Sequence, residues 1–282
     1  MYEQAILNGF ELQVKGAPFV RWAGGKRSLL KYLLPLVPSH FGRYYEPFLG
    51  GGALFFALQP ARAQLSDSNA DLINCYIQVR DNPEAVINEL RQLKNTADEY
   101  YKIRGDVPED CIAQAARFIY LMALSFNGIH RLNGDGKFNV PYNHKPQADY
   151  YDPQRIRAAS VALASAKLST CDFEQALTTA EGGDLIYFDP PYTVAHGNNG
   201  FIEYNAKIFS WTDQIKLAQL ATELKDRGCA VIVSNADHPS ILELYKEFQV
   251  KRVSRSSGIA ASGKYRRQVT EYIFYNEVKH SC

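Results

Sequence analysis

DLIYFDPPYT, residues 184–193, begins with an apolar run and ends in a carboxylate, two prolines and an aromatic ring. Proline lacks a backbone N–H and fixes φ at about −65°, so Pro190 and Pro191 end a buried strand and hold the next residues rigid. A rigid corner that carries Asp189, free carbonyl groups and the ring of Tyr192 is suited to hold a flat, polar group. The alternative is a proline-ended strand with a structural role only.

Strands and helices alternate on both sides of this corner. The patterns predict short strands at 44–46 and 63–66, a strand in CAVIVSN (229–235), and two final strands that end in EYIFYN. They predict helices at 26–37, 153–166, 212–227 and 239–248. Alternating strands and helices are typical of a mainly parallel sheet with helices on both faces.

The middle of the chain has a different pattern. Residues 82–125 have helical periodicity, and 126–150 are polar and rich in turn signals, with a short hairpin arm expected at 137–140. We therefore expect residues 1–75 and 151–282 to form the sheet domain, and residues 76–150 to be a mostly helical insertion with a hairpin loop.

Composition narrows the class of protein. The chain has 282 residues, a net charge of +1, and no apolar run or N-terminal pattern of a membrane span or secretory signal. The five cysteines are scattered, which favours reduced thiols in the cytoplasm and argues against zinc or disulfides. We expect no bound metal, and we expect His130 and His144 to be surface imidazoles in polar loops. The stretch 251–267 is basic and lacks acids; it is either a phosphate-binding patch or a solvated loop.

Three groups follow predicted strands, where an open α/β sheet binds its ligands. They are EPFLGGG (46–52), Asp67 and the DPPY corner. Glycines let backbone approach a ligand closely, and an acid about 20 residues after such a turn can bind ribose hydroxyls. The turn lacks the G-x-G-x-x-G pattern and there is no G-x-x-x-x-G-K-[ST], which argues against NAD and nucleoside triphosphates. A nucleoside without pyrophosphate, such as S-adenosyl-L-methionine, fits better.

Five segments together resemble the Dam-type (class alpha, D12 class) DNA adenine N6-methyltransferases. In chain order they are FVRWAGGKRSLL, EPFLGGGALFF, SDSNADLI, FNGIHRLNGDGKFNVPY and DLIYFDPPY, and the resemblance runs from residue 18 to 276. It implies a Rossmann-like S-adenosylmethionine-dependent methyltransferase sheet, with the catalytic domain at 1–75 and 151–282 and target recognition at 76–150. The implied reaction is methyl transfer from S-adenosyl-L-methionine to the N6 amine of an adenine turned out of duplex DNA.

The resemblance assigns roles to particular residues. The Asp189 carboxylate and the Pro190 carbonyl would accept the two amine hydrogens, Pro191 would stiffen the corner, and Tyr192 would stack on the base. Cofactor contacts are implied for Trp22, Ala23, Gly24, Gly25, Lys26, Glu46, Phe48, Gly50, Gly51, Gly52, Asp67, Asp172, Phe173 and Asp189. The alternative for Trp22 is a core aromatic residue, and the match at 171–173 is loose.

DNA contacts are implied for Arg21, Asn127, Gly128, Ile129, Arg131, Asn133, Asn139, Arg255, Lys264 and Arg266. Arg131 is expected to make the bidentate guanine contact that specific readers use most often. The family often has lysine where this chain has Arg21, so the outer base preference stays open. The predicted target is GATC or a related site.

The expected partner is double-stranded DNA, with no metal and no membrane. We expect a cytoplasmic monomer, and a cognate restriction endonuclease is a candidate genetic partner. Two alternatives stay open at this point. One is methylation of a planar amine in RNA or in a glutamine side chain; the other is a non-catalytic DNA-binding protein with the same fold.

Overall fold

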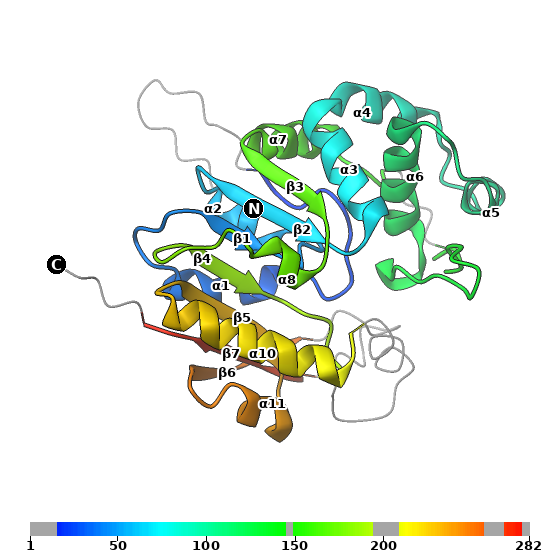
Figure 1. The fold of residues 1–282 in the computed structure, drawn as a ribbon. Coiled ribbons are helices and arrows are strands. Elements are labelled where there is room, and N and C mark those ends of the chain that lie inside the picture. Colours follow the sequence, from blue (N-terminus) through cyan, green and yellow to red (C-terminus); the bar gives the residue numbers. More distant parts are fainter. Residues whose placement is uncertain (1–15, 145–148, 194–208, 257–267, 278–282) are drawn as a thin grey trace.

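A single mixed sheet forms the centre of the molecule (Figure 1). The computed structural model describes residues 16–144, 149–193, 209–256 and 268–277. The strand order is β3-β2-β1-β4-β5-β7-β6, and only β6 and β7 run antiparallel to their neighbours. The strands are β1 (Tyr44–Glu46), β2 (Ala63–Asp67), β3 (Ala166–Thr170), β4 (Leu185–Phe188), β5 (Ala230–Ala236), β6 (Gln249–Ser256) and β7 (Gln268–Tyr275). The predicted mainly parallel sheet is confirmed.

Helices cover both faces of the sheet, because alternate strand residues point to opposite faces. In β4 all four residues are at most 1% exposed. Leu185 and Tyr187 join one apolar cluster, and Ile186 and Phe188 join the other. The helices around the first cluster are α1 (Leu30–Leu33), α2 (Ala53–Leu58), α3 (Ala70–Asp81), α4 (Pro83–Gln92), α6 (Cys111–Leu124) and α7 (Pro153–Leu163).

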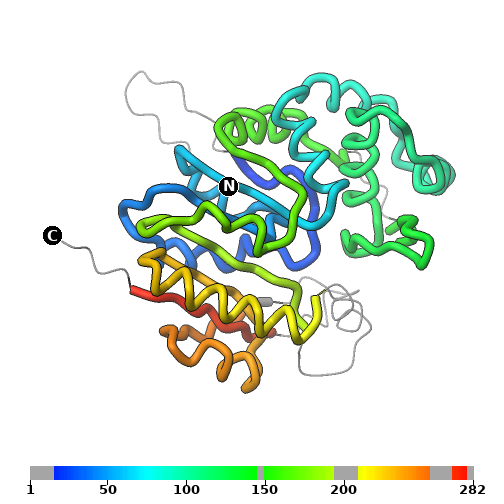
Figure 2. The backbone as a smooth tube through the Cα atoms, in the orientation of Figure 1, coloured from blue at the N-terminus to red at the C-terminus, as the bar shows by residue number. Residues whose placement is uncertain are grey.

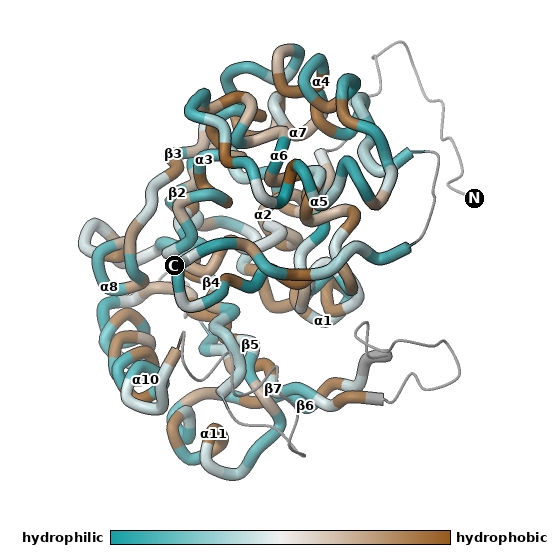
Figure 3. Tube along the Cα trace, turned by 90° about the vertical axis from the view of Figure 1, so that its right-hand side faces the viewer, coloured by the Kyte–Doolittle hydropathy of each residue, from teal (hydrophilic) through white to brown (hydrophobic). Residues whose placement is uncertain are grey.

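The second cluster packs under three other helices. They are α8 (Phe173–Ala176), α10 (Trp211–Asp226) and α11 (Pro239–Leu244). Hydrophobic and hydrophilic residues alternate along α10 (Figure 3), as expected for a helix with one face on the sheet. Its buried residues include Leu217, Ala221 and Leu224.

The helical segment between β2 and β3 extends from one end of the sheet (Figure 2). It contains α4, α5 (Ala97–Gly105) and α6, followed by the short 3-10 turn η3 (Phe126–Gly128). Helix α3 runs across residue 76 and packs on both α6 and α7. The polypeptide therefore passes from the sheet to the insertion within a helix, and the domain division stays a prediction.

Two local expectations were wrong, and a third holds only over a short stretch. Residues 26–37 form not one helix but η1 (Arg27–Leu29), α1 and η2 (Leu34–Leu36), because Pro35 cannot donate the next helical hydrogen bond. Strand β3 was not anticipated; only Ala166 in it is buried, so it lacks an apolar run. The expected hairpin arm at 137–140 pairs only briefly, through the bridge Leu132↔Phe138 and backbone hydrogen bonds between residues 131–133 and 137–139. No helix among the described residues is long and apolar enough to cross a bilayer.

Candidate active site

Three acids from separate segments meet at the carboxyl edge of the parallel strands. Glu46 ends β1, Asp67 ends β2, and Asp189 follows β4. Strand β1 lies between β2, the next strand in the sequence, and β4, which comes much later in the chain. The strand order reverses at β1 and β4, which is where open α/β sheets bind ligands.

Lys26 lies against the DPPY corner. Its Nζ is 3.1 Å from Asp189 Oδ1 and donates to the Tyr192 hydroxyl at 2.8 Å. The same ammonium lies 4.4 Å from the centroid of the Tyr192 ring. Lys26 is only 5% exposed, so its charge acts in a medium that screens it weakly. The sequence analysis expected Lys26 to contact the cofactor; the structure places its ammonium beside Asp189.

Glu271 of β7 is a site residue that the sequence analysis missed. It is fully buried, accepts a hydrogen bond from the Tyr192 hydroxyl at 2.9 Å, and lies 3.5 Å from Lys26 Nζ. Burial and the carboxylates of Glu271 and Asp189 raise the pKa of Tyr192, so this phenol stays protonated. The available signal was a single glutamate within the apolar stretch VTEYIFY.

The corner is also held from α10. Gln214, which is fully buried, donates through Nε2 to the Pro191 carbonyl at 3.3 Å. Asn235 of β5 donates in turn to Gln214 Oε1 at 2.9 Å. Because both side chains are buried, each needs its hydrogen-bond partner. These two amides therefore fix one side of the corner.

Glu46 is a buried carboxyl at the end of β1. The Tyr44 hydroxyl donates to its Oε2 at 2.8 Å. Burial raises the pKa of Glu46 to about 8; the Tyr44 hydrogen bond opposes this rise and the charge of Asp189 adds to it. The side chain is therefore mostly neutral at neutral pH.

The free energy of unfolding should depend on pH because Glu46 ionises. The pKa of Glu46 is raised from an ordinary 4.5 to about 8, so the folded state binds the extra proton between these values. The stabilisation is complete below about pH 4.5 and is lost as pH rises through about pH 8. We expect the wild-type free energy of unfolding to fall by about 1–4 kcal/mol across this window relative to Glu46→Gln. Urea unfolding of both proteins at several pH values measures it; parallel curves would contradict the assignment.

The glycine turn fits closely around Trp22. Gly50 has φ +46°, and a Cβ added there would lie 2.8 Å from the indole. The Asp67 carboxylate accepts hydrogen bonds from the Gly50 and Asn69 backbone N–H groups, both at 3.0 Å. Burial raises the pKa of Asp67, and these hydrogen bonds offset part of the rise. Gly51 and Gly52 continue the turn into α2, and Ala23, Gly24 and Gly25 follow Trp22 in the facing loop.

Two aromatic rings lie beside this turn. Phe48 and Phe173 are nearly parallel, with centroids 5.6 Å apart and an interplanar angle of 25°. Asp172 caps α8, because its Oδ1 accepts from the Gln175 N–H at 2.8 Å. The predicted segment at 172–173 is therefore brought next to Phe48, with its aspartate used at least partly as a helix cap.

The expected recognition loop is shaped by asparagines. Asn127 has φ +58°, a left-handed conformation that asparagine tolerates. Asn133 Oδ1 accepts from the N–H groups of Asp135 and Lys137 at 3.0 and 2.9 Å, so it closes a turn. Arg131 is exposed, and its Nε donates to Asn139 Oδ1 at 2.8 Å. Ile129 lies between these groups and is partly exposed.

His130 joins this loop to Trp22 and Asn69, so the imidazole expected at the surface is in fact partly buried. Its ring stacks on Trp22 with centroids 6.0 Å apart, and its Nδ1 lies 3.4 Å from Asn69 Nδ2. Burial lowers the pKa of His130, which favours the neutral imidazole. Trp22 also stacks near Phe118, so it has the core contacts of the alternative interpretation as well as its position at the turn.

Arg21 passes directly over Gly128. A Cβ added to Gly128 would lie 2.8 Å from Arg21 Cγ and Nε, so the arginine needs a glycine at this position. Gly128 also has φ +64°. The two predicted DNA-contacting segments are therefore fitted to each other.

We expect Gly128→Ala to weaken DNA binding by about 10-fold, because the substitution displaces Arg21 as well as straining the backbone. The matched control is Gly136→Ala, since Gly136 has φ +73° but no neighbour within 4 Å of an added Cβ. Fluorescence anisotropy with a labelled duplex measures both. Equal losses in the two variants would show that strain alone, and not the Arg21 contact, is responsible.

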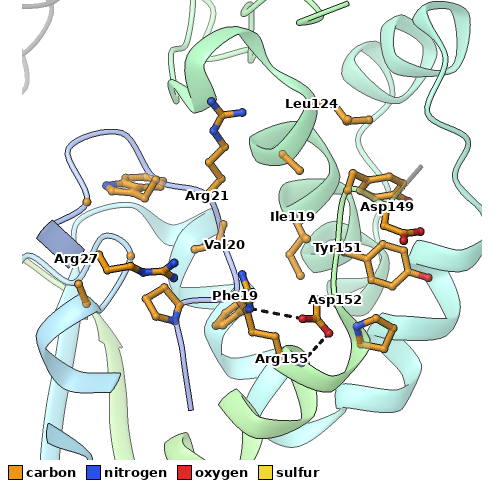
Figure 4. Close-up of a pocket in the computed structure, with 18 of the residues that line it drawn as sticks. Phe19, Val20, Arg21, Arg27, Ile119, Leu124, Asp149, Tyr151, Asp152 and Arg155 are labelled. Atoms are coloured by element: carbon orange, nitrogen blue, oxygen red, sulfur yellow. Dashed lines mark hydrogen bonds and ion pairs between the residues drawn. The ribbon is translucent and has the colours of Figure 1, made fainter. Parts of the chain in front are cut away.

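A cavity of about 820 Å³ lies beside this contact (Figure 4). It opens between the loop that carries Arg21 and Arg27, the end of α6, and residues 149–155. Asp189 does not line it, so the cavity is separate from the DPPY corner. Its wall is polar where Asp152 pairs with Arg155.

The basic stretch is only partly described. Arg252 pairs with Asp237, with Nη2 2.6 Å from Oδ2, so its charge is already compensated. The side chain of Arg255, together with Lys264 and Arg266, lies outside the described residues. Among the residues that the structure describes, no cluster of His, Cys, Asp and Glu could hold a metal ion.

Comparison with known proteins supplies the family. The sequence model described as D12 class N6 adenine-specific DNA methyltransferase matches residues 22–259. The type II methyltransferase M1.LlaDCHI of Lactococcus lactis subsp. cremoris is 37% identical, covering 92% of this chain and 95% of that protein. The type II methyltransferase M.MjaIII of Methanocaldococcus jannaschii is 33% identical, covering 89% and 95%. A DNA adenine methylase of Haemophilus influenzae is 30% identical, covering 93% and 94%.

The fold and these matches agree. A mostly parallel seven-stranded sheet with helices on both faces is consistent with a Rossmann-like methyltransferase. The chain belongs to the D12 class of N6 adenine-specific DNA methyltransferases. The resemblance inferred from its motifs is confirmed, and the enzyme methylates adenine in DNA.

Proposed function

We propose that this enzyme transfers the methyl group of S-adenosyl-L-methionine to the N6 amine of an adenine turned out of duplex DNA, in GATC or a closely related site. The observation that carries the proposal is the position of Asp189. Its carboxylate lies at the switch point of the sheet, 20% exposed, between the two prolines and Lys26. A carboxylate in that place can accept a hydrogen from a substrate amine.

The chemistry needs rigid acceptors. The lone pair of the adenine N6 amine is delocalised into the ring, so the amine is a poor nucleophile. Asp189 and the Pro190 carbonyl accept its two hydrogens and favour a pyramidal nitrogen whose lone pair is free. Because the prolines and the Gln214 contact hold these acceptors in place, they need no reorganisation as charge develops. Tyr192 presents its ring to the base, and Asp189 is the first acceptor for the proton that the amine releases.

The edge of the sheet suits the cofactor. Gly50 has no Cβ, so the turn packs closely against Trp22, and the two together form one wall of the proposed cofactor site. Asp67 lies beside it to accept ribose hydroxyls, and Phe48 with Phe173 offers faces for an adenine ring. A cationic amine beside Glu46 would lower the pKa of this buried carboxyl, so binding would favour its ionised form. When bound, S-adenosyl-L-methionine supplies an electrophilic methyl group on a sulfonium.

Exposed arginines near the expected recognition loop support duplex DNA as the substrate. Asn139 accepts from Arg131 at Nε and, at 3.4 Å, at Nη2, so Nη1 and the second N–H of Nη2 are the groups that would meet guanine O6 and N7. Among the described residues, Arg21 and Arg27 form no ion pair with a carboxylate, and both are exposed. These charges are therefore available for phosphates or for a flanking base. We assign residues 76–150 to target recognition on this basis.

The direct test uses purified enzyme, labelled S-adenosyl-L-methionine and unmethylated plasmid. The product is digested with one endonuclease that requires methylated GATC and one that methylated GATC blocks. Label in DNA with a switch in both digests supports the proposal. Label in DNA without a change in either digest would overturn the GATC assignment. Arg21 would then be the first residue to test as the cause of a different base preference. Label in RNA but not in DNA would overturn the duplex substrate.

The relatives with type II names suggest a role in modification. We propose that this chain protects DNA against a cognate restriction endonuclease of the same sequence specificity. Plasmid recovered from cells that express the chain should resist an endonuclease with that recognition site. Full digestion of fully methylated plasmid by every endonuclease encoded in the same genome would contradict the role.

A further inference from the structure

Glu271 lies where the reversed strand of the sheet approaches the catalytic edge. Strand β7 runs antiparallel to β5, and Glu271 is opposite Ala236, the last residue of β5. On its other side it is opposite Val253 of β6. A residue early in β7 is thereby placed at the carboxyl edge, near a corner that lies 79 positions earlier in the chain.

A fully buried carboxylate is costly unless it is paired and hydrogen-bonded. Glu271 has both kinds of contact. Its Oε2 accepts from the Tyr192 hydroxyl at 2.9 Å and lies 3.5 Å from Lys26 Nζ. Apolar packing alone would be served at least as well by an apolar side chain, since replacing a buried ion pair by hydrophobic residues is often stabilising.

Two contacts of the Glu271 carboxylate lead to the corner. Lys26 Nζ has two carboxylates near it, Asp189 at 3.1 Å and Glu271 at 3.5 Å. The Tyr192 hydroxyl accepts from Lys26 and donates to Glu271, so its position is fixed from two sides. The orientation of the Tyr192 ring and the electrostatic state of Asp189 therefore both depend on Glu271.

We propose that Glu271 is a positioning residue for methyl transfer. It fixes the ring of Tyr192 through the hydroxyl, and it shares the charge of Lys26 with Asp189. If Glu271 is neutral, Asp189 alone balances the ammonium, and the tighter pairing weakens Asp189 as a hydrogen-bond acceptor for the substrate amine. This inference rests on the proposed role of Asp189.

The test compares Glu271→Gln with Tyr192→Phe. Glutamine keeps the length of the side chain and an acceptor oxygen but removes the charge, and phenylalanine keeps the ring but removes the hydroxyl. We expect Glu271→Gln to lower the single-turnover rate by about 10- to 100-fold. The dissociation constants for DNA and for S-adenosyl-L-methionine should stay within about 3-fold, because the effect arises at the reacting groups.

A double-mutant cycle of Glu271→Gln and Tyr192→Phe then measures how strongly the two side chains are coupled. If Glu271 acts through the Tyr192 hydroxyl and the shared ammonium, the double variant should lose less than the product of the two single losses. Strict multiplication of the losses would contradict action through Tyr192. Glu271→Asp, which restores the charge on a shorter side chain, should recover part of the rate.

The matched control is Asp184→Asn. Asp184 is another buried carboxylate, but it lies before β4, at the opposite edge of the sheet, where it accepts from the N–H groups of Arg43 and Glu181 at 2.8 and 3.0 Å. We expect this control to lower the melting temperature and to leave the rate unchanged. A Glu271→Gln enzyme with the wild-type rate and a lowered melting temperature would overturn the proposal. Wild-type transfer to adenine in the same assay tests the proposed function separately.

Discussion

Asp189→Ala is expected to lower the rate of methyl transfer by about 10³-fold or more while the protein still binds DNA and S-adenosyl-L-methionine. The variant removes the carboxylate that accepts an amine hydrogen, and leaves the Pro190 carbonyl as the remaining acceptor. Lys26 keeps its contact with Glu271, so the substitution does not leave a buried ammonium without a carboxylate. Single-turnover transfer from labelled cofactor measures the rate, and calorimetry measures both affinities.

Two comparisons make the Asp189 result specific. Asp184→Asn changes a carboxylate at the opposite end of the same strand and should retain the rate. Asp189→Asn keeps the shape and one acceptor oxygen but removes the charge and the second oxygen, so its rate should lie between those of the wild type and the alanine variant. An alanine variant that transfers within 10-fold of the wild-type rate would contradict the mechanism, because positioned acceptors should contribute more than this.

Arg131→Ala is expected to lower discrimination at one guanine of the target by about 10- to 100-fold. The guanidinium is exposed, and two hydrogen bonds to Asn139, from Nε to Oδ1 and from Nη2 to the carbonyl, fix its orientation. Loss of a bidentate base contact should therefore relax specificity at a single position. Transfer rates on a set of duplexes with one base pair changed at a time measure the effect.

Lys137→Ala is the control for Arg131, since it removes one positive charge from the same loop. It should weaken binding to all duplexes alike and reduce the salt dependence of affinity. A uniform loss for Arg131→Ala as well would assign that arginine to the phosphate backbone. Relaxed discrimination at an outer base in Gly128→Ala would identify Arg21 as the second reader.

Local patterns determined much of this protein. The run that ends in Asp189 and two prolines, the glycine turn and Asp67 are each readable from neighbouring residues, because strands end where prolines and polar residues interrupt an apolar run. Their order along the chain was enough to predict the sheet and the family. Pro35 also carried a local signal, and the break that it makes in residues 26–37 was predictable in principle.

Contacts between distant segments were decided only by the tertiary structure. Lys26 and Tyr192 are 166 positions apart, and Tyr192 and Glu271 are 79 apart. The residues next to Glu271 in the sequence do not indicate that its partner is Tyr192. Its position follows from the strand order, in which β7 enters antiparallel beside β5. The same holds for His130 on Trp22 and Arg21 over Gly128, because which loops meet is fixed by the packing of helices and sheet, and not by the residues of either loop alone.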